Sequence, residues 1–276
     1  MHMVLDGVEW KQAIFRHSQK VNIPYIHKVL SSYKKAGYTY LRDGGDRWGV
    51  GAMARALAPQ YGITYRTPLA PLCKTGHYGA FIGRAYENMG EYAALVNENR
   101  REGGDFIKIM ISGLMDFNRA GVLTEEGLDD GEIKELIHIA HEEGFSVMAH
   151  CNGARTMEAA AAAGVDSIEH GTYGDESAFA AMIENGTVWV PTVSTVANLR
   201  GTGRFPEKEV EAIVEHFYEN IQRYAAMGGL LAVGSDAGAW AVYHGTGSEE
   251  VHLGKILGAE AENILQAGTA VIMKRF

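Results

Sequence analysis

Short apolar runs alternate with longer amphipathic stretches along this chain, and that order constrains the fold more than any other feature. Seven runs of apolar and β-branched residues end in glycine or polar residues, as buried strands do: 38–45, 63–70, 106–113, 145–153, 167–173, 188–195 and 230–238. Helical periodicity lies before or between them, over 23–36, 46–58, 86–103, 130–143, 154–164, 175–186 and 206–228. Strands that alternate with helices in this way predict a parallel sheet covered by helices.

Two kinds of parallel sheet fit this alternation, an open sheet and a closed barrel. No Gly-x-Gly-x-x-Gly sequence follows the first run, so nothing supports dinucleotide binding by an open sheet. Polar residues end several of the runs, and in a TIM-type (β/α)8 barrel the carboxyl ends of the strands carry the active site. We therefore predict an α/β fold of this barrel type, formed by a single domain over 1–276. The barrel needs eight strands and seven runs are found, so we expect it to be incomplete at strand one.

Composition and charge exclude several other classes of protein. The 276 residues include 25 Lys and Arg against 34 Asp and Glu, a formal net charge of −9, and no basic run; a nucleic-acid partner is not expected. No stretch of 18 or more apolar residues occurs, so no membrane span is expected. Cys73 and Cys151 are too few for a disulfide framework, and the first residues lack the pattern of a signal peptide. We expect a cytoplasmic enzyme.

Four polar residues lie within or at the ends of four different runs. Lys108 lies between Ile107 and Ile109, and a buried lysine is costly unless it is neutral, paired or modified. His150, His170 and Asp236 end the three other runs. Each has an ordinary structural explanation, since such a histidine is often hydrogen-bonded, such a lysine ion-paired, and an aspartate after Gly-Ser often caps a helix. In a barrel, however, all four meet at one mouth, where they suit a divalent cation such as zinc.

Several motifs carry a resemblance to a known family. In order along the chain, Arg-Asp-Gly-Gly (42–45), Ile-Lys-Ile-Met (107–110), Met-Ala-His (148–150), Val-Asp-Ser-Ile-Glu-His-Gly (165–171) and Gly-Ser-Asp-Ala-Gly (234–238) resemble the metal-dependent amidohydrolase superfamily, in its imidazolonepropionase-like and prolidase-like branch. The resemblance implies a carboxylated Lys108 that bridges two metal ions. It implies that His150 and His170 bind one ion, and that Asp236 binds the other and shuttles the proton.

The chain departs from this family at its amino end. The family's first strand ends in a His-x-His pair, and here the chain opens Met1-His2-Met3, so that His2 matches the second histidine. Alternatively, these residues are a cloning remnant and His2 matches nothing. The segments that form the family's small β-sandwich domain are also missing. Because open sheet edges are costly, we expect them to be covered by residues 1–8, by 259–276 or by a second copy of the chain, which favours a homo-oligomer.

Three further residues are candidates for substrate binding. His77 follows the second strand run in a Gly- and His-containing loop, which resembles a substrate-facing loop of this family, and Tyr173 lies three residues after His170. His244 lies just beyond Asp236, where it would orient substrate. The ordinary alternatives are a flexible polar loop for His77 and a turn residue for His244.

The resemblance implies metal-assisted hydrolysis of an amide bond, with one or two divalent ions, zinc by preference. A small-molecule amide, either an N-acyl amino acid or a dipeptide, is the expected substrate. Asp236 would act as general base and then as general acid. Two alternatives remain open: a Schiff-base enzyme in which Lys108 is the nucleophile, and a truncated relative without activity.

Overall fold

The computed structural model describes residues 1–276 as an α/β fold in which every strand pairing is parallel. Two strands form a small sheet, and six strands form a larger sheet in the order β4-β3-β5-β6-β7-β8. The strands are β1 (Tyr40–Arg42), β2 (Thr64–Arg66), β3 (Leu72–Lys74), β4 (Arg84–Tyr86), β5 (Ile107–Met110), β6 (Val147–Cys151), β7 (Ser167–His170) and β8 (Val188–Val190).

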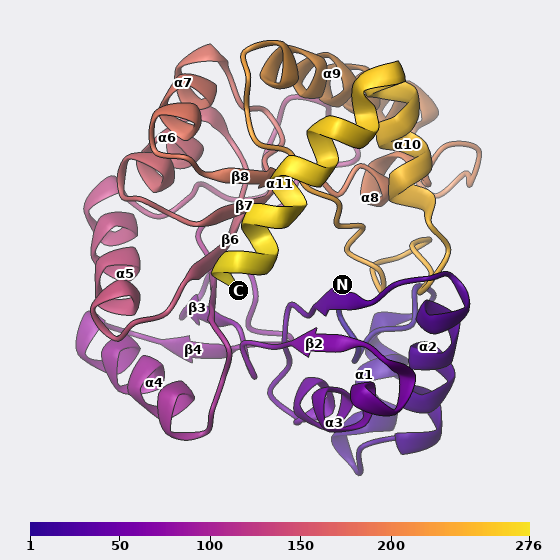
Figure 1. Ribbon diagram of the computed structural model, residues 1–276. Helices are drawn as coiled ribbons and strands as arrows, with labels where there is room; N and C mark the ends of the chain where they lie inside the picture. The colour runs from indigo at the N-terminus through magenta and orange to yellow at the C-terminus, as the bar shows by residue number, and fades with distance from the viewer.

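Helices surround the two sheets (Figure 1). They are α1 (Trp10–Ser18), α2 (Ile23–Lys35), α3 (Val50–Leu57), α4 (Met89–Arg101), α5 (Asp130–Glu142), α6 (Ala154–Ala162), α7 (Glu176–Glu184), α8 (Ser194–Ala197), α9 (Glu207–Ala226), α10 (Ser248–Leu257) and α11 (Ala261–Arg275), with short 3-10 turns at Ala58–Tyr61 and Gly258–Glu260. The seven helical stretches expected from periodicity are confirmed as α2 to α7 and α9, with ends within four residues. None of the helices is both long enough and apolar enough to cross a membrane.

Three strand assignments need correction. The run 230–238 was expected to be a strand, but only Leu231 in it pairs with β8, through a single bridge to Trp189. Further along the run, Asp236 has a φ of 54°, which no strand residue adopts. Conversely, β3 and β4 were not expected, and both have only three residues. The structure therefore does not show a closed eight-stranded barrel.

Residues at the amino end lie in the gap between β1 and the segment after Leu231. The carbonyl of Met1 accepts from the N–H of Gly44 (2.7 Å), while the N–H of His2 donates to the carbonyl of Ala237 (2.8 Å). Further along, the N–H of Gly7 donates to the carbonyl of Gly238 (3.0 Å). The expectation that residues 1–8 cover an open edge is thus confirmed for this end of the gap.

Helix α11 runs across the amino-terminal ends of the strands, and its end reaches the middle of the molecule (Figure 1). The Arg275 guanidinium donates to the carbonyls of Asp166 and Gly186, which precede β7 and β8 (3.1 and 2.9 Å). The hydroxyl of Ser146, which precedes β6, donates to the carbonyl of Arg275 (2.8 Å). The last ring, Phe276, packs edge-on against Phe106. The carboxyl-terminal segment therefore covers the amino-terminal ends of β6, β7 and β8.

A buried acid braces α10 against α8. The Glu249 carboxylate accepts from the backbone N–H groups of Val193 and Ser194, each at 2.8 Å, and its side chain is fully buried. Burial raises the pKa of Glu249 from 4.5 to about 7. These hydrogen bonds join the start of α8, which follows β8, to α10.

We expect Glu249→Ala to destabilise the fold by about 2–4 kcal/mol, because it leaves two buried N–H groups without an acceptor. Between pH 4.5 and about 7, Glu249 keeps its proton in the folded state but loses it in the unfolded state. The contribution of Glu249 to the free energy of unfolding therefore decreases as the pH rises through this range. Urea unfolding should therefore show that Glu249→Ala lowers the free energy of unfolding more at pH 5 than at pH 8. Glu215→Ala, at an exposed position on α9, is the control. If Glu249→Ala and Glu215→Ala lowered the free energy of unfolding by the same small amount, Glu249 would not stabilise the contact between α8 and α10.

Candidate functional site

A cavity of about 700 Å³ opens at the carboxyl ends of the strands and holds most of the predicted residues. Its wall follows from the alternation of side chains along each strand. On β5, Ile107 and Ile109 point into the core and Lys108 into the cavity. On β6, Ala149 points into the core and His150 into the cavity. His2, His170 and Asp236 line the same cavity.

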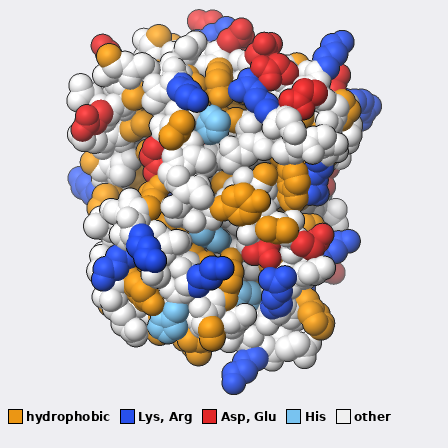
Figure 2. Space-filling view, turned by 90° about the vertical axis from the view of Figure 1, so that its right-hand side faces the viewer, with side chains coloured by type: hydrophobic (Ala, Val, Ile, Leu, Met, Phe, Trp, Pro, Cys, Tyr) orange, Lys and Arg blue, Asp and Glu red, His pale blue; other side chains and the backbone are white.

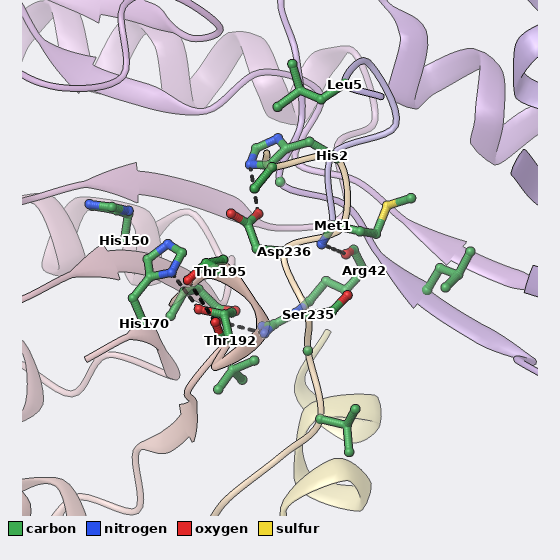
Figure 3. A pocket seen from close by; sticks show the side chains of 18 of the residues that line it. Met1, His2, Leu5, Arg42, His150, His170, Thr192, Thr195, Ser235 and Asp236 are labelled. Atoms are coloured by element: carbon green, nitrogen blue, oxygen red, sulfur yellow. Dashed lines mark hydrogen bonds and ion pairs between the residues drawn. The ribbon is translucent and has the colours of Figure 1, made fainter. Parts of the chain in front are cut away.

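His150 and His170 form a pair of fixed imidazoles (Figure 3). Their ring centroids lie 4.6 Å apart, and the planes meet at 63°. His150 Nε2 lies 3.2 Å from the carbonyl of Gly113, and His170 Nδ1 lies 2.7 Å from Oγ1 of Thr192. One nitrogen of each ring is therefore held by a neighbour, and the other nitrogen makes no hydrogen bond within the protein.

The partners of the two rings define where each proton lies. The carbonyl of Gly113 only accepts, so Nε2 of His150 carries the hydrogen. The Thr192 hydroxyl donates to the carbonyl of Pro191 (2.6 Å), so it accepts from Nδ1 of His170. The free lone pairs are then those of His150 Nδ1 and His170 Nε2. Hydrogen bonds of this kind are the usual means of orienting histidines that bind metal ions.

Burial keeps both imidazoles neutral. Burial, and then the nearby charge of Lys108, lowers the pKa of His150 to about 3. Burial also holds the pKa of His170 well below its usual value, with His150 and Lys108 as further causes. A neutral imidazole with a free lone pair is the form that binds a metal ion.

The backbone of three residues around the cavity lies in the left-handed region. His170, Thr192 and Asp236 have φ values of 71°, 57° and 54°. Non-glycine residues rarely adopt this conformation, and it costs of order 1–3 kcal/mol. The Trp189 indole N–H donates to the carbonyl of His170 (2.7 Å) and so holds one of these strained positions. Strain of this kind clusters at functional sites.

Lys108 is buried without an ion pair. Its side chain is 3% exposed, and no carboxylate lies within 4.0 Å of its nitrogen. Burial lowers the pKa of Lys108 to about 8, although Glu169 and Asp236 oppose this shift. Glu169 is already occupied, because it accepts from Arg42 (2.7 Å) and from the Ser167 hydroxyl (2.7 Å). This lowered pKa gives Lys108 more of the neutral form than an ordinary lysine has, and a neutral amine is nucleophilic.

Asp236 faces His2 across a short gap (Figure 3). Asp236 Oδ1 lies 3.7 Å from His2 Nε2, while His2 Nδ1 lies 3.2 Å from the carbonyl of Gly45 and therefore carries the hydrogen. A lone pair and a carboxylate oxygen thus face one another. Burial raises the pKa of Asp236 and lowers that of His2. Gly44 permits this approach, because a Cβ there would lie 2.2 Å from the His2 ring.

The three candidates for substrate binding do not line the cavity. His77 Nδ1 lies 3.9 Å from Glu125, and the next residue, Tyr78, lines the cavity instead. The Tyr173 hydroxyl accepts from the N–H of Gly121 (2.8 Å). His244 lies 2.9 Å from the carbonyl of Leu5 and 3.0 Å from the Tyr33 hydroxyl, so it ties the amino end of the chain to α2.

Several residues at this site were not predicted. The Tyr78 ring lies 4.7 Å from the ring of His150, and the Asn152 amide donates to the same carbonyl of Gly113 as His150 (3.0 Å). Asn152 directly follows β6 and Thr192 lies two residues after β8, and this position after a strand is the one signal in the sequence that marks them. Arg42 bonds Glu169 at the floor of the cavity and lies 4.4 Å from the Phe276 ring.

The donors present fit a divalent cation in part. No three side chains of His, Cys, Asp or Glu lie close enough together to hold a metal ion by themselves. They come as two pairs, His150 with His170 and His2 with Asp236. Burial, with the Lys108 charge as a smaller cause, lowers the pKa of the three histidines, whereas burial raises the pKa of Asp236. Neutral imidazole and carboxylate are donors that zinc prefers. The donor chemistry therefore suits zinc, with Lys108 next to both pairs.

Comparison with known proteins gives relatives in sequence and neighbours in structure. No family model matches the chain. An uncharacterized protein of Mycobacterium tuberculosis is 29% identical over 202 residues, which cover 71% of this chain and 54% of the relative. Ochratoxinase of Aspergillus niger is 26% identical over 174 residues, covering 59% of this chain and 35% of that enzyme. The chain thus spans about half or less of the length of these curated relatives.

The structural neighbours extend over nearly the whole chain. A crystal structure of a Xaa-Pro dipeptidase with bound methionine has a TM-score of 0.76 and 23% identity, covering 99% of this chain and 73% of its own. The A. niger ochratoxinase structure has a TM-score of 0.76 and 20% identity, covering 96% and 68%. A prolidase structure in complex with N-methylphosphonate-L-proline has a TM-score of 0.76 and 23% identity, covering 99% of this chain and 73% of its own. The fold is that of these dipeptidase, ochratoxinase and prolidase structures.

Proposed function

We propose that this chain is a metal-dependent amidohydrolase that cleaves the amide bond of an N-acyl amino acid or a dipeptide. The observation that carries the proposal is the paired geometry of His150 and His170, whose free lone pairs face a cavity beside Lys108 and Asp236. The names of a Xaa-Pro dipeptidase and an ochratoxinase among the similar proteins support amide hydrolysis.

His150 and His170 would hold the cation in this proposal, and a carboxylated Lys108 would supply an anionic oxygen beside them. When bound, a divalent cation polarises the amide carbonyl and lowers the pKa of the attacking water toward ~7. Thr192 and Gly113 orient the two imidazoles through their hydrogen bonds. His2 and Asp236 provide donors for a second ion, and that site has only these two protein donors.

Asp236 carries the proton. Water adds to the carbonyl carbon of the amide, and the Asp236 carboxylate takes the proton that the water loses. The C–N bond then breaks, and Asp236 returns the proton to the nitrogen of the leaving amine, so that a carboxylic acid and an amine are released. Asp236 lies in the cavity opposite His2, and its side chain is 21% exposed, so it can contact both water and substrate.

Lys108 also supports the alternative proposal, a Schiff-base enzyme, because burial brings its pKa to about 8. That mechanism gives no role to the oriented histidine pair, so we favour hydrolysis. Borohydride trapping with carbonyl compounds distinguishes the two, since only a Schiff base leaves a reduced adduct on Lys108.

The test of the proposed function is a hydrolysis assay on N-acyl amino acids and dipeptides, with both products identified by mass spectrometry. We expect release of the amine and the acid in equal amounts, at a rate that depends on added zinc. Absence of hydrolysis over the whole panel, with zinc bound to the protein, would contradict the proposal.

A further inference from the structure

Aromatic side chains from α1 and from separate loops line one part of the cavity. Phe117 and Phe205 pack with their ring centroids 5.0 Å apart, and Trp10 and Phe81 pack at 5.2 Å. Together with Trp240, all of these residues line the cavity. On the face that carries α2 and α10, hydrophobic side chains gather in the middle, with charged side chains above and below them (Figure 2). The entrance therefore suits an apolar group.

Arg204 is the one cation of this apolar entrance. Its guanidinium carbon lies 4.3 Å from the ring centroid of Trp240 and 5.6 Å from that of Phe205. No carboxylate lies within 4.0 Å of it, whereas Arg200, on the same loop, is paired with Glu211. The other two cations of the cavity wall are deeper: Arg42 is bonded to Glu169, and Lys108 lies beside the histidines.

Stacking leaves the donors of Arg204 available. A guanidinium that lies against an aromatic ring uses its face, and its five N–H donors point outward in its own plane. These donors match the two oxygens of a carboxylate in a bidentate arrangement. Trp240 holds the group in place, and Trp240 follows Asp236 by four residues on the same loop. Arg204, through its contact with Trp240, is thus connected to the loop that carries Asp236, the proposed proton acceptor.

We propose that Arg204, stacked on Trp240, binds a carboxylate of the substrate, so that the site selects amides with a free carboxylate over neutral amides. The apolar part of such a ligand would lie against Phe117, Phe205 and Trp240. A single carboxylate matches a single guanidinium, and the deeper wall carries Asp236 and Glu169, which disfavour more highly charged anions. That the enzyme hydrolyses amides with a free carboxylate in preference to neutral amides rests on the proposed function, while the binding of a carboxylate by Arg204 does not.

The experiment compares two ligands of nearly equal shape, N-benzoylglycine and its neutral primary amide. Calorimetry and tryptophan fluorescence measure their binding to the unaltered chain, to Arg204→Gln, to Arg204→Lys and to Arg47→Gln. Arg47 is a matched control, because it stacks on Trp48 at 4.9 Å but lies outside the cavity. We expect Arg204→Gln to weaken binding of N-benzoylglycine by about 10- to 100-fold, and to leave binding of the amide unchanged.

Arg204→Lys keeps the charge but not the planar pair of donors, so it should recover only part of the affinity. The proposal is overturned if Arg204→Gln binds N-benzoylglycine as the unaltered chain does, if it loses both ligands equally, or if Arg47→Gln shows the same loss. Where hydrolysis occurs, Arg204→Gln should raise KM and leave kcat nearly unchanged. Carboxylate binding that depends on Arg204 without any hydrolysis would refute the proposed function alone.

Discussion

Replacement of Asp236 by Asn should lower kcat for amide hydrolysis by about 10²- to 10⁴-fold, the usual contribution of general acid–base catalysis. Asn has the shape of Asp, but its amide neither takes the proton of the attacking water nor returns one to the amine. Because Asp236 faces His2 and not the histidine pair, metal bound by His150 and His170 should be retained. Steady-state kinetics and elemental analysis of the same preparation measure both effects.

Asp175→Asn is the control for this variant. Asp175 caps the first turn of α7 by accepting from the N–H of Ala178 (2.9 Å), away from the cavity, and Asn is an equally good cap. Its kinetics should match those of the unaltered chain. Turnover of Asp236→Asn at the unaltered rate would exclude Asp236 as the proton carrier.

His150→Ala and His170→Ala should each remove most of the bound metal, since each deletes one of two oriented imidazoles. His138→Ala should not, because His138 is an exposed residue of α5 that pairs only with Glu142. Elemental analysis of the three purified variants, with circular dichroism to establish that each is folded, makes the comparison. Unchanged metal content in both cavity variants would contradict the assignment of the pair.

Thr192→Val provides a second test that leaves both imidazoles in place. It removes the oxygen that accepts from His170 Nδ1, so the ring loses its orientation and its defined tautomer. Loss of such a partner typically costs 10- to 100-fold in metal affinity, which we expect here. A competition titration with a zinc chelator measures it, and an unchanged affinity would show that Thr192 does not orient a ligand.

The strand-borne part of the site is what the sequence predicts best. Lys108 and His150 lie between apolar neighbours, and alternation along a buried strand places them in the cavity. His170 and Asp236 were expected there as well, but their positive φ values show that a bend of the backbone, and not alternation alone, aims them. No pattern of apolar residues encodes such a bend.

Loops account for most of what was not predicted. His77 was proposed from a resemblance of its loop, and Tyr173 and His244 from their proximity in sequence to His170 and Asp236; neither determines the direction of a side chain after a turn. Arg204 lies in a Gly-rich segment without periodicity, and its role depends on Trp240, a residue from another loop. The strands β3 and β4 are too short for a period of two to be visible.

The covering of the sheet edges depends on contacts between distant segments. The run 230–238 has the apolar composition of a strand, but Leu231 is the one residue of it that pairs with β8. Met1 to Gly7 then bond to both sides of the remaining gap, and α11 covers the strands from below. The cost of open edges predicts that something covers them, with residues 1–8, residues 259–276 and a second copy as alternatives, while the actual pairing partners are set by tertiary structure.

Hydrolysis of an N-acyl amino acid before and after removal of metal tests the central claim most directly. The rate, measured on the unaltered chain, should be lost on treatment with a chelator and restored by stoichiometric zinc, with no adduct on Lys108 after borohydride. Hydrolysis that persists in a chain free of metal, or a borohydride-trapped adduct on Lys108, would contradict metal-dependent amide hydrolysis at this cavity.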